Sequence, residues 1–500
     1  MDSLWIDRTS GMAHSPLSGD VEADVVIIGA GITGLMCALQ ASASGRRVVV
    51  LEAAEVGGAN TGRSTGNLYA TVSGGLAKLR EKWSAEQVQA VVAARLAAVR
   101  HIAAVCERME LAADLVLCPM HIGASDPEWE EWIERERAAC AEAGLHAERE
   151  ASLQVGRRAV TTALRIDDQA QCNPHRLATG LALALRQAGV CIHASSPVTM
   201  VDANPGCVQT ALGRVRAPWI VMATHSPLGF NLVQAEMKPL REYAVSARDP
   251  EVSLSAGIHW LKDAGRSVRS YGGRLVVVGG KHVTGAPEPG IDYPGQLQAF
   301  AREVFGASDF DHVWSAQQFE SADGLPYIGR SAHDNVLIAT GFGADGLVWG
   351  TVAAQLLGEL IDGRDESDLV QLLRPRRFTP VKSARGWASE NASVVRHFVG
   401  DRLRRGEARF SDVPAGSGRI VEIEGSKYAV YRNDAGRVHV LSPVCPHLKC
   451  LVAWNALEST WDCPCHGSRF HADGRVLEGP AASGLDCVSR DGEAEVLASG

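Results

Sequence analysis

One short segment, DVVIIGAGITGLMCALQ at residues 24–40, restricts the fold of this chain more than any other. The continuous apolar run over 24–28 predicts a buried strand. Apolar residues at helical spacing predict a helix over 32–44, and a second strand is expected over 47–51. A strand, a glycine turn, a helix and a second strand form a βαβ unit, so we expect a Rossmann-type α/β domain to begin here.

The glycines of that turn predict a dinucleotide site. Gly29 allows the tight turn, Gly31 lets a pyrophosphate approach the backbone, and Gly34 lets the helix pack closely on the sheet. The phosphates would lie at the helix N-terminus, where unpaired N–H groups favour anions. Glu52 ends the second strand, where its carboxylate can accept from ribose hydroxyls. The motif by itself does not separate FAD from NAD.

Four residues near the other end of the chain predict a metal centre. Cys445 and His447 are spaced C-x-H, and Cys463 and His466 follow after fifteen residues with the spacing C-x-x-H. Two cysteines and two histidines can bind zinc. Here each loop contributes one cysteine and one histidine, so the thiolates can bind one iron and the imidazoles the other, as in a Rieske [2Fe–2S] centre. Rieske is the favoured interpretation and zinc the alternative.

The sequence around these ligands resembles Rieske domains, with Gly467-Ser468 after the second histidine and a later Gly479-Pro480 loop. The resemblance to the Rieske proteins of quinol-oxidising complexes implies a disulfide between Cys450 and Cys465. In those proteins a tyrosine follows the CPCHGS motif by two residues, whereas this chain has Phe470. The missing hydroxyl implies a lower cluster potential.

Three further stretches resemble the FAD-dependent D-amino-acid oxidase and glycine oxidase superfamily, over about residues 20–375. They are GRSTGN at 62–67, DGLPYIG at 323–329 and VLIATGFGADGLVWGTVAAQLLGELI at 336–361. The resemblance implies FAD as the cofactor and a loop over the flavin at 62–67. The implied FAD contacts, beyond the glycine turn and Glu52, are Arg63, Ser64, Thr65, Gly66, Asn67, Val198, Gly341, Gly343, Asp345 and Gly346.

The last of these stretches repeats the glycine spacing at Gly341, Gly343 and Gly346, which raises the alternative of a second, NAD-binding site. A second strand ending in an acidic residue does not follow it in the sequence. We therefore expect the backbone N–H groups near Gly343–Gly346 to face the C2 carbonyl end of the flavin, where they would stabilise the charge of the reduced ring.

The resemblance bears on the substrate through a departure from the family pattern. An arginine that holds the substrate carboxylate commonly lies just before the DGLP-like segment, and this chain has Gln318 there. Without a bidentate partner for a carboxylate, an amine is at least as good a candidate as an amino acid. Arg241 is either an alternative carboxylate clamp or a surface residue. His225 either touches the cofactor or is structural, and no catalytic acid or base is assigned.

The expected fold is an α/β (α+β) FAD-binding Rossmann-type domain with a mixed-sheet substrate domain, followed by a small all-β Rieske domain. The expected boundaries are 1–373 for the flavin domain, 374–408 for a connector with a short helix near 389–402, and 409–500 for the Rieske domain. Within the first domain, residues 1–22 read as an irregular leader. Helices are expected over 85–110, 127–143 and 173–189, and strands over 216–223 and 273–279.

Bulk properties limit the function. A formal net charge of −9 argues against a general nucleic-acid binder. No continuous apolar run reaches the roughly 18 residues of a membrane span, and the first twenty residues do not resemble a secretory signal, so a cytoplasmic location is expected.

These features favour a flavin-dependent oxidoreductase that oxidises a small molecule. Its Rieske cluster would relay single electrons to an acceptor protein or a quinone. The alternatives are a redox sensor or structural protein, and a reductase whose electrons enter at the cluster. A mononuclear-iron oxygenase is disfavoured, because only 34 residues follow His466.

Overall fold

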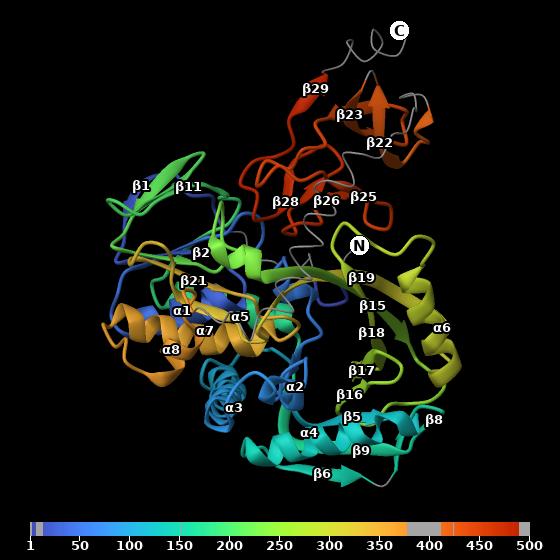
Figure 1. The fold of residues 1–500 in the computed structure, drawn as a ribbon. Coiled ribbons are helices and arrows are strands. Elements are labelled where there is room, and N and C mark those ends of the chain that lie inside the picture. Colours follow the sequence, from blue (N-terminus) through green and yellow to red (C-terminus); the bar gives the residue numbers. More distant parts are fainter. Residues whose placement is uncertain (1–2, 7–13, 151, 378–411, 424, 490–500) are drawn as a thin grey trace.

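The computed structural model describes residues 3–6, 14–150, 152–377, 412–423 and 425–489 (Figure 1). Most of the expected connector, with its helix near 389–402, lies outside the described residues. The described chain forms a large N-terminal α/β unit and a smaller unit of antiparallel strands after residue 411, which confirms the expected fold class.

A six-stranded sheet forms the centre of the N-terminal unit. Five neighbouring strands are parallel and the edge strand β20 is antiparallel, which is the pattern of a doubly wound α/β domain. The strands β2, β3 and β21 are buried along their whole length, as expected of parallel strands covered on both faces. In sheet order the strands are β10 (Cys191–His193), β3 (Val48–Leu51), β2 (Val25–Ile28), β14 (Trp219–Met222), β21 (Val336–Thr340) and β20 (Tyr327–Arg330).

Helices cover one face of this sheet, where α1 packs directly against α7, and the other face packs on apolar strand residues that include Val208 and Val215 (Figure 1). The predicted helices over 32–44, 85–110, 127–143 and 173–189 are confirmed as α1, α3, η2 with α4, and α5. The helices are α1 (Ile32–Ala43), α2 (Leu76–Arg80), α3 (Ala85–Arg108), α4 (Glu130–Glu142), α5 (Pro174–Gln187), α6 (Tyr293–Phe305), α7 (Gly346–Ile361) and α8 (Asp368–Leu373), with short 3-10 turns η1 (Thr61–Arg63), η2 (Pro127–Trp129) and η3 (Leu232–Glu236).

Helix α3 is the one described helix whose length and composition would allow it to cross a membrane. Core helices pass the same test, and 44% of its most apolar stretch is buried inside the protein. It also buries Arg95 completely, and the Arg95 side chain donates to the backbone carbonyls of Tyr69, Ala70 and Thr71. These contacts give α3 a structural role within the N-terminal unit.

A nine-stranded, mainly antiparallel sheet lies beside the first one. Its β15 and β18 face α6 through an apolar cluster that includes Tyr243, Leu297 and Phe305. In sheet order the strands are β19 (Asp309–Ser321), β15 (Met237–Arg248), β18 (Arg274–Val283), β17 (Arg266–Tyr271), β16 (Ile258–Leu261), β5 (Val116–Ala124), β9 (Thr162–Gln171) and β4 (Asn67–Leu68), with β6 (Ala147–Glu150) also paired to β9.

The expected irregular leader is wrong in one part, because residues 19–22 form a strand. This strand, β1 (Gly19–Glu22), pairs in parallel with β13, and its exposed side chains hide it from a pattern search. It belongs to a four-stranded sheet completed by β13 (Gly213–Arg216), β12 (Cys207–Thr210) and β11 (Val198–Asp202), while β7 (Leu153–Val155) and β8 (Arg158–Val160) form a separate hairpin.

The C-terminal unit consists of two four-stranded antiparallel sheets. Figure 1 shows it in orange and red, next to the β15 and β19 edge of the nine-stranded sheet. One sheet contains β22 (Ser417–Ile423), β23 (Ser426–Arg432), β24 (Val438–Leu441) and β29 (Cys487–Ser489). The other contains β25 (Ala453–Asn455), β26 (Thr460–Asp462), β27 (Arg469–His471) and β28 (Val476–Glu478).

Candidate functional site

The turn between β2 and α1 is so tight that side chains are excluded from its three glycine positions. A Cβ at Gly34 would lie 1.9 Å from the Gly29 carbonyl oxygen, and one at Gly29 would lie 2.5 Å from the Ala223 carbonyl oxygen. A Cβ at Gly31 would lie 2.9 Å from Thr61 Oγ1, which already accepts from the Ile32 N–H at 3.0 Å. The turn therefore has the shape that a pyrophosphate cradle requires at a helix N-terminus.

Glu52 lies half-buried at the end of β3, beside this turn. Its carboxylate accepts from the backbone N–H groups of Ala30, at 2.8 Å, and Ala54, at 3.0 Å. Burial raises the pKa of Glu52. The Ser196 N–H donates to the Glu52 carbonyl at 2.8 Å, so Val198, two residues further on, begins β11 close to the same sheet end. The chain thus brings Glu52, the predicted acceptor for the ribose hydroxyls, and Val198 to the glycine turn.

The predicted flavin loop at 62–67 is held from three directions. The indole N–H groups of Trp5 and Trp314 donate to the carbonyls of Ser64, at 2.7 Å, and Arg63, at 3.0 Å. Arg269 donates to the Thr65 carbonyl at 2.6 Å. The six residues comprise the end of η1, two linking residues, Gly66 and the start of β4 at Asn67. The loop is consequently fixed between the two sheets.

The glycines of the stretch at 336–361 lead from β21 into α7. Asp345 precedes the first helical residue, Gly346. The Asp345 side chain is buried and accepts from Tyr69 Oη at 2.5 Å and the Ser73 N–H at 3.0 Å, with Arg95 at 3.3 Å. Those partners hold the start of α7, whose first N–H groups have no partner within the helix. Among the described residues, no strand of the six-stranded sheet follows α7, so a second βαβ unit is absent there.

His225 and Arg241, whose roles the sequence did not decide, lie where the N-terminal unit meets the C-terminal one. His225 is half-buried, its Nδ1 lies 2.6 Å from Asn60 Nδ2, and desolvation by the surrounding protein lowers its pKa to about 4. Arg241 is fully buried and its Nη2 donates to Ser315 and, at 2.7 Å, to Glu458 of the C-terminal unit, while its Nε and Nη1 are buried without a hydrogen-bond partner among the described residues. The expectation that Arg241 is a surface residue is therefore wrong, and its role as a carboxylate clamp stays a prediction.

The four predicted metal ligands come from two neighbouring loops. Cys445 and His447 lie between β24 and β25, and Cys463 and His466 lie between β26 and β27. The two thiols are close enough to share a hydrogen bond, and the two imidazole rings have centroids 5.0 Å apart. The loops therefore bring both cysteines together and both histidines together, as an iron pair with unlike ligands requires.

The histidines are prepared to bind metal through Nδ1. The Nδ1 atoms of His447 and His466 are both buried without a hydrogen-bond partner among the described residues. His447 Nε2 lies 3.2 Å from the Gly229 carbonyl oxygen, an acceptor, so the ring proton is on Nε2 and the lone pair on Nδ1. Burial lowers the pKa of His466 to about 4, which keeps that ring neutral. Neutral imidazoles with free Nδ1 atoms fit a [2Fe–2S] cluster.

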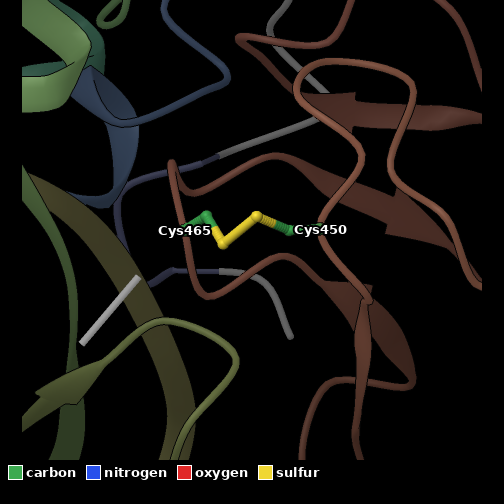
Figure 2. Close-up of a disulfide and its surroundings, with 2 residues drawn as sticks. All are labelled: Cys450 and Cys465. Atoms are coloured by element: carbon green, nitrogen blue, oxygen red, sulfur yellow. A yellow bond between two sulfur atoms is a disulfide. The ribbon is translucent and has the colours of Figure 1, made fainter. Parts of the chain in front are cut away.

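Cys450 and Cys465 form a disulfide that joins the two loops (Figure 2). Their sulfurs lie within 4.8 Å of Cys463 Sγ, which gives a compact group of three cysteines. Two of those sulfurs are bonded to each other and cannot bind metal, so this group is a neighbour of the metal site and not the site itself. The bridge is the pairing that the resemblance implied.

Several residues that sequence patterns did not indicate connect the two predicted cofactor sites. Asn60 precedes Thr61, whose Oγ1 accepts from the Ile32 N–H beside the glycine turn, and Asn60 Oδ1 accepts from the Gln317 N–H at 3.0 Å. Gln317 Nε2 donates to the carbonyl of Gly467, beside ligand His466, at 2.8 Å. Gln234 Oε1 lies 3.0 Å from His447 Nε2. Only Asn60 had a local signal, its position just before the GRSTGN stretch, since the other contacts span distant parts of the chain.

Comparison with known proteins agrees with this geometry. A family described as FAD dependent oxidoreductase (DAO) matches residues 24–360, and the Rieske [2Fe-2S] domain family matches residues 407–489. The first match covers more than half of the chain. This chain belongs to the DAO family of FAD dependent oxidoreductases. Its C-terminal unit is a Rieske domain, so the protein is an oxidoreductase whose cofactors are FAD and a [2Fe–2S] cluster.

Relatives of the flavin–Rieske chain fall into two groups. A protein of Bacillus subtilis (strain 168) named as a Rieske 2Fe-2S iron-sulfur protein, YhfW, is 27% identical over 98% of both chains. The cytochrome b6-f complex iron-sulfur subunit of Synechococcus sp. (strain JA-3-3Ab) is 48% identical over 62 residues, which are 12% of this chain and 36% of the subunit.

Solved structures resemble the FAD domain in fold. Glycine oxidase from Geobacillus kaustophilus is 20% identical with a TM-score of 0.60 and covers 72% of this chain and 100% of its own. L-Amino acid deaminase from Proteus myxofaciens is 17% identical with a TM-score of 0.59 and covers 74% of this chain and 97% of its own.

Proposed function

We propose that this protein oxidises a small amine at the FAD and passes the electrons singly, through the Rieske cluster, to an external acceptor. One observation carries the proposal: the loop that holds His466 is hydrogen-bonded through Gln317 to Asn60, whose neighbour Thr61 accepts from the Ile32 N–H beside the glycine turn. A cluster anchored this close to the flavin-binding loops can receive electrons without any domain movement. The proposed location is the cytoplasm, and the proposed domain limits are those expected from the sequence.

When bound, FAD accepts a hydride from a C–H bond next to nitrogen and gives up its electrons one at a time, and the cluster takes one electron per reduction. This difference makes the cluster useful to an enzyme whose acceptor takes single electrons. The chain's own residues have to hold the substrate, exclude other ligands and hold the cluster in place.

The pair of Gln318 and Glu242 supports an amine over a carboxylate. Gln318 is buried at the position where related oxidases carry the carboxylate-binding arginine, and its Nε2 donates to Glu242 Oε2 at 2.6 Å. Its Oε1 is buried without a hydrogen-bond partner among the described residues. A carboxylate oxygen and an unpaired amide oxygen both accept hydrogen bonds, so they suit the N–H groups of an amine and repel a carboxylate.

Glu242 lies in the electrostatic environment of the α7 start, where the flavin ring is expected. Burial disfavours the charge of Lys281, yet Glu320, Glu242 and Asp345 together outweigh burial and raise the pKa of Lys281. Asp345 immediately precedes α7. Glu242 can therefore accept a hydrogen bond from an amine bound near the start of α7.

The test is anaerobic mixing of the oxidised protein with a panel of small amines and the matching amino acids. We expect amines to bleach the flavin absorbance first and the reduced-cluster EPR signal to follow. Glu242→Gln should weaken amine binding, measured by the perturbation of the flavin spectrum at equilibrium, and Asp334→Asn, a change to an acidic residue in the turn before β21, should not.

Different results would indicate other functions. Amino acids as the better substrates would refute the amine proposal. Cluster reduction before flavin reduction would show that electrons enter at the Rieske domain and that the protein is a reductase. A flavin that no compound in the panel reduces would favour a redox sensor.

A further inference from the structure

Three exposed apolar side chains lie on chain segments that contact or adjoin one ligand of the cluster, His447. Phe230 and Leu232 are 69% and 75% exposed, and Leu448 is 37% exposed. Phe230 and Leu232 come from the FAD domain, in the segment between Gly229 and Gln234, and Leu448 follows His447 in the Rieske domain. We call these three side chains the seam patch, because they lie on both sides of the boundary between the domains.

The seam patch lies where the cluster comes nearest to the surface. His447 is partly exposed, whereas Cys445, Cys463 and His466 are 1%, 1% and 8% exposed. The two residues that contact His447 Nε2, Gly229 and Gln234, are the immediate flanks of the segment that carries Phe230 and Leu232. A partner protein that covers the seam patch would therefore lie closer to His447 than to the other three cluster ligands.

The same contacts disfavour a quinone at this position. His447 Nε2 lies 3.2 Å from the Gly229 carbonyl oxygen and 3.0 Å from Gln234 Oε1, so its proton is already donated. A quinone would need that N–H for its carbonyl oxygen, and its alternative partner, the other histidine ligand, is buried. A protein partner needs no hydrogen bond from His447, because apolar contacts at the rim are sufficient for a brief encounter.

We propose that the seam patch is the docking surface for a small one-electron carrier protein, whose own apolar rim covers Phe230, Leu232 and Leu448 and whose cofactor then faces His447. This inference rests on the proposed exit of electrons through the cluster. Weak electron-transfer interfaces are small, below roughly 1,200 Å² in total, so three apolar side chains can form the centre of one. The patch also continues the apolar and polar contacts between the domains, where Gly229 N–H donates to the Pro480 carbonyl at 3.1 Å.

The experiment measures oxidation of the cluster after chemical reduction with dithionite, so its outcome does not depend on the amine substrate. Reduced full-length protein is mixed with cytochrome c, with ferricyanide or with a short-chain quinone, and cluster oxidation is followed by circular dichroism. The variants are Phe230→Ser and Leu232→Ser. The control is Leu212→Ser, since Leu212 is 64% exposed in the turn between β12 and β13, away from the cluster.

We expect each seam-patch variant to slow oxidation by cytochrome c roughly five- to tenfold, as when one apolar side chain is lost from a small interface. Oxidation by ferricyanide, which needs no docking surface, should be unchanged, and Leu212→Ser should behave as wild type with every acceptor. Full cluster EPR intensity in the variants confirms that the site is intact.

Three results would overturn the proposal. The first is an equal loss with ferricyanide and cytochrome c, which would mean that the substitutions alter the cluster. The second is a loss confined to the quinone, which would make the patch a quinone site. The third is unchanged cytochrome c kinetics in the variants. If the wild type but not the variants then sediments with phosphatidylcholine vesicles, the patch is a membrane contact.

Discussion

At the scale of single residues, hydrogen bonds and burial around the cluster determine how readily it accepts an electron. Phe470 is fully buried in an apolar group that also contains Cys445, Cys463 and the disulfide cysteines. A donor added at the ring edge would therefore be shielded from solvent and lie in the same apolar group as the cluster cysteines. Donors stabilise the more negative, reduced cluster and raise the potential.

We expect Phe470→Tyr to raise the cluster potential. One net hydrogen bond contributes about 0.5–1.5 kcal/mol, which corresponds to roughly 20–65 mV for one electron at about 59 mV per tenfold. Protein-film voltammetry measures the shift, and EPR shows whether the cluster is intact. A lowered or unchanged potential with an intact cluster would mean that Phe470 only packs the loop.

The hydrogen bond that Gln234 accepts from His447 should lower the potential of the cluster, whereas a donor to sulfur raises it. Gln234 Oε1 accepts the His447 Nε2 proton, which increases the electron density on the imidazole and disfavours reduction. We expect Gln234→Leu to raise the potential by about 20–65 mV, the equivalent of one hydrogen bond. Asn231→Leu is the matched control, because Asn231 caps the same turn without contacting His447. An equal rise in both variants would assign the effect to the turn and not to the hydrogen bond.

At the scale of elements, the β2–α1 turn can be tested separately from the Rieske loops. We expect Gly31→Val to abolish FAD binding, because a side chain there meets Thr61 Oγ1 and fills the space of the pyrophosphate. The Rieske EPR signal should remain. Gly74→Val is the control, since a Cβ at Gly74 meets nothing within 4 Å. Flavin content after denaturation, measured by absorbance, decides the outcome, and a full complement of FAD in Gly31→Val would contradict the cradle.

Elements whose residues are adjacent in sequence were predictable, because local spacing determines their geometry. The β2–α1–β3 unit and the four cluster ligands belong to this class. The strand β1 was missed because its side chains are mostly exposed and it forms by pairing with β13, nearly two hundred residues away. The burial of Arg241 was missed for a similar reason: PLREYAV shows a strand, but the carboxylate of Glu458 that binds this arginine lies 217 residues further along the chain.

At the scale of the whole molecule, a buried ionic network joins the two domains. Arg241 and Arg469 both donate to Glu458, at 2.7 and 2.8 Å, and Arg469 also contacts Asp462 and Glu478. Burial alone would raise the pKa of Glu458, and the two arginines reverse this and hold its pKa at about 2. The network is therefore charged at any physiological pH and fixes one orientation of the Rieske domain.

We expect Arg241→Met to destabilise the docked state by about 3–5 kcal/mol, the usual cost of removing one partner from a buried ion pair. In thermal unfolding followed by cluster circular dichroism and by flavin fluorescence, the two transitions should coincide in the wild type and separate in this variant. Arg214→Met, which removes an exposed pair with Asp20, should leave them together. Coincident transitions in Arg241→Met would show that the network does not couple the domains.

The fixed position of the Rieske domain has a kinetic consequence. Two separate proteins exchange electrons at a rate that rises with their concentrations, whereas tethered and docked domains meet at a constant effective concentration. In the proposed function, electron transfer from flavin to cluster is therefore a first-order process whose rate does not depend on the concentration of the protein. Only the proposed encounter with the external acceptor would then depend on concentration.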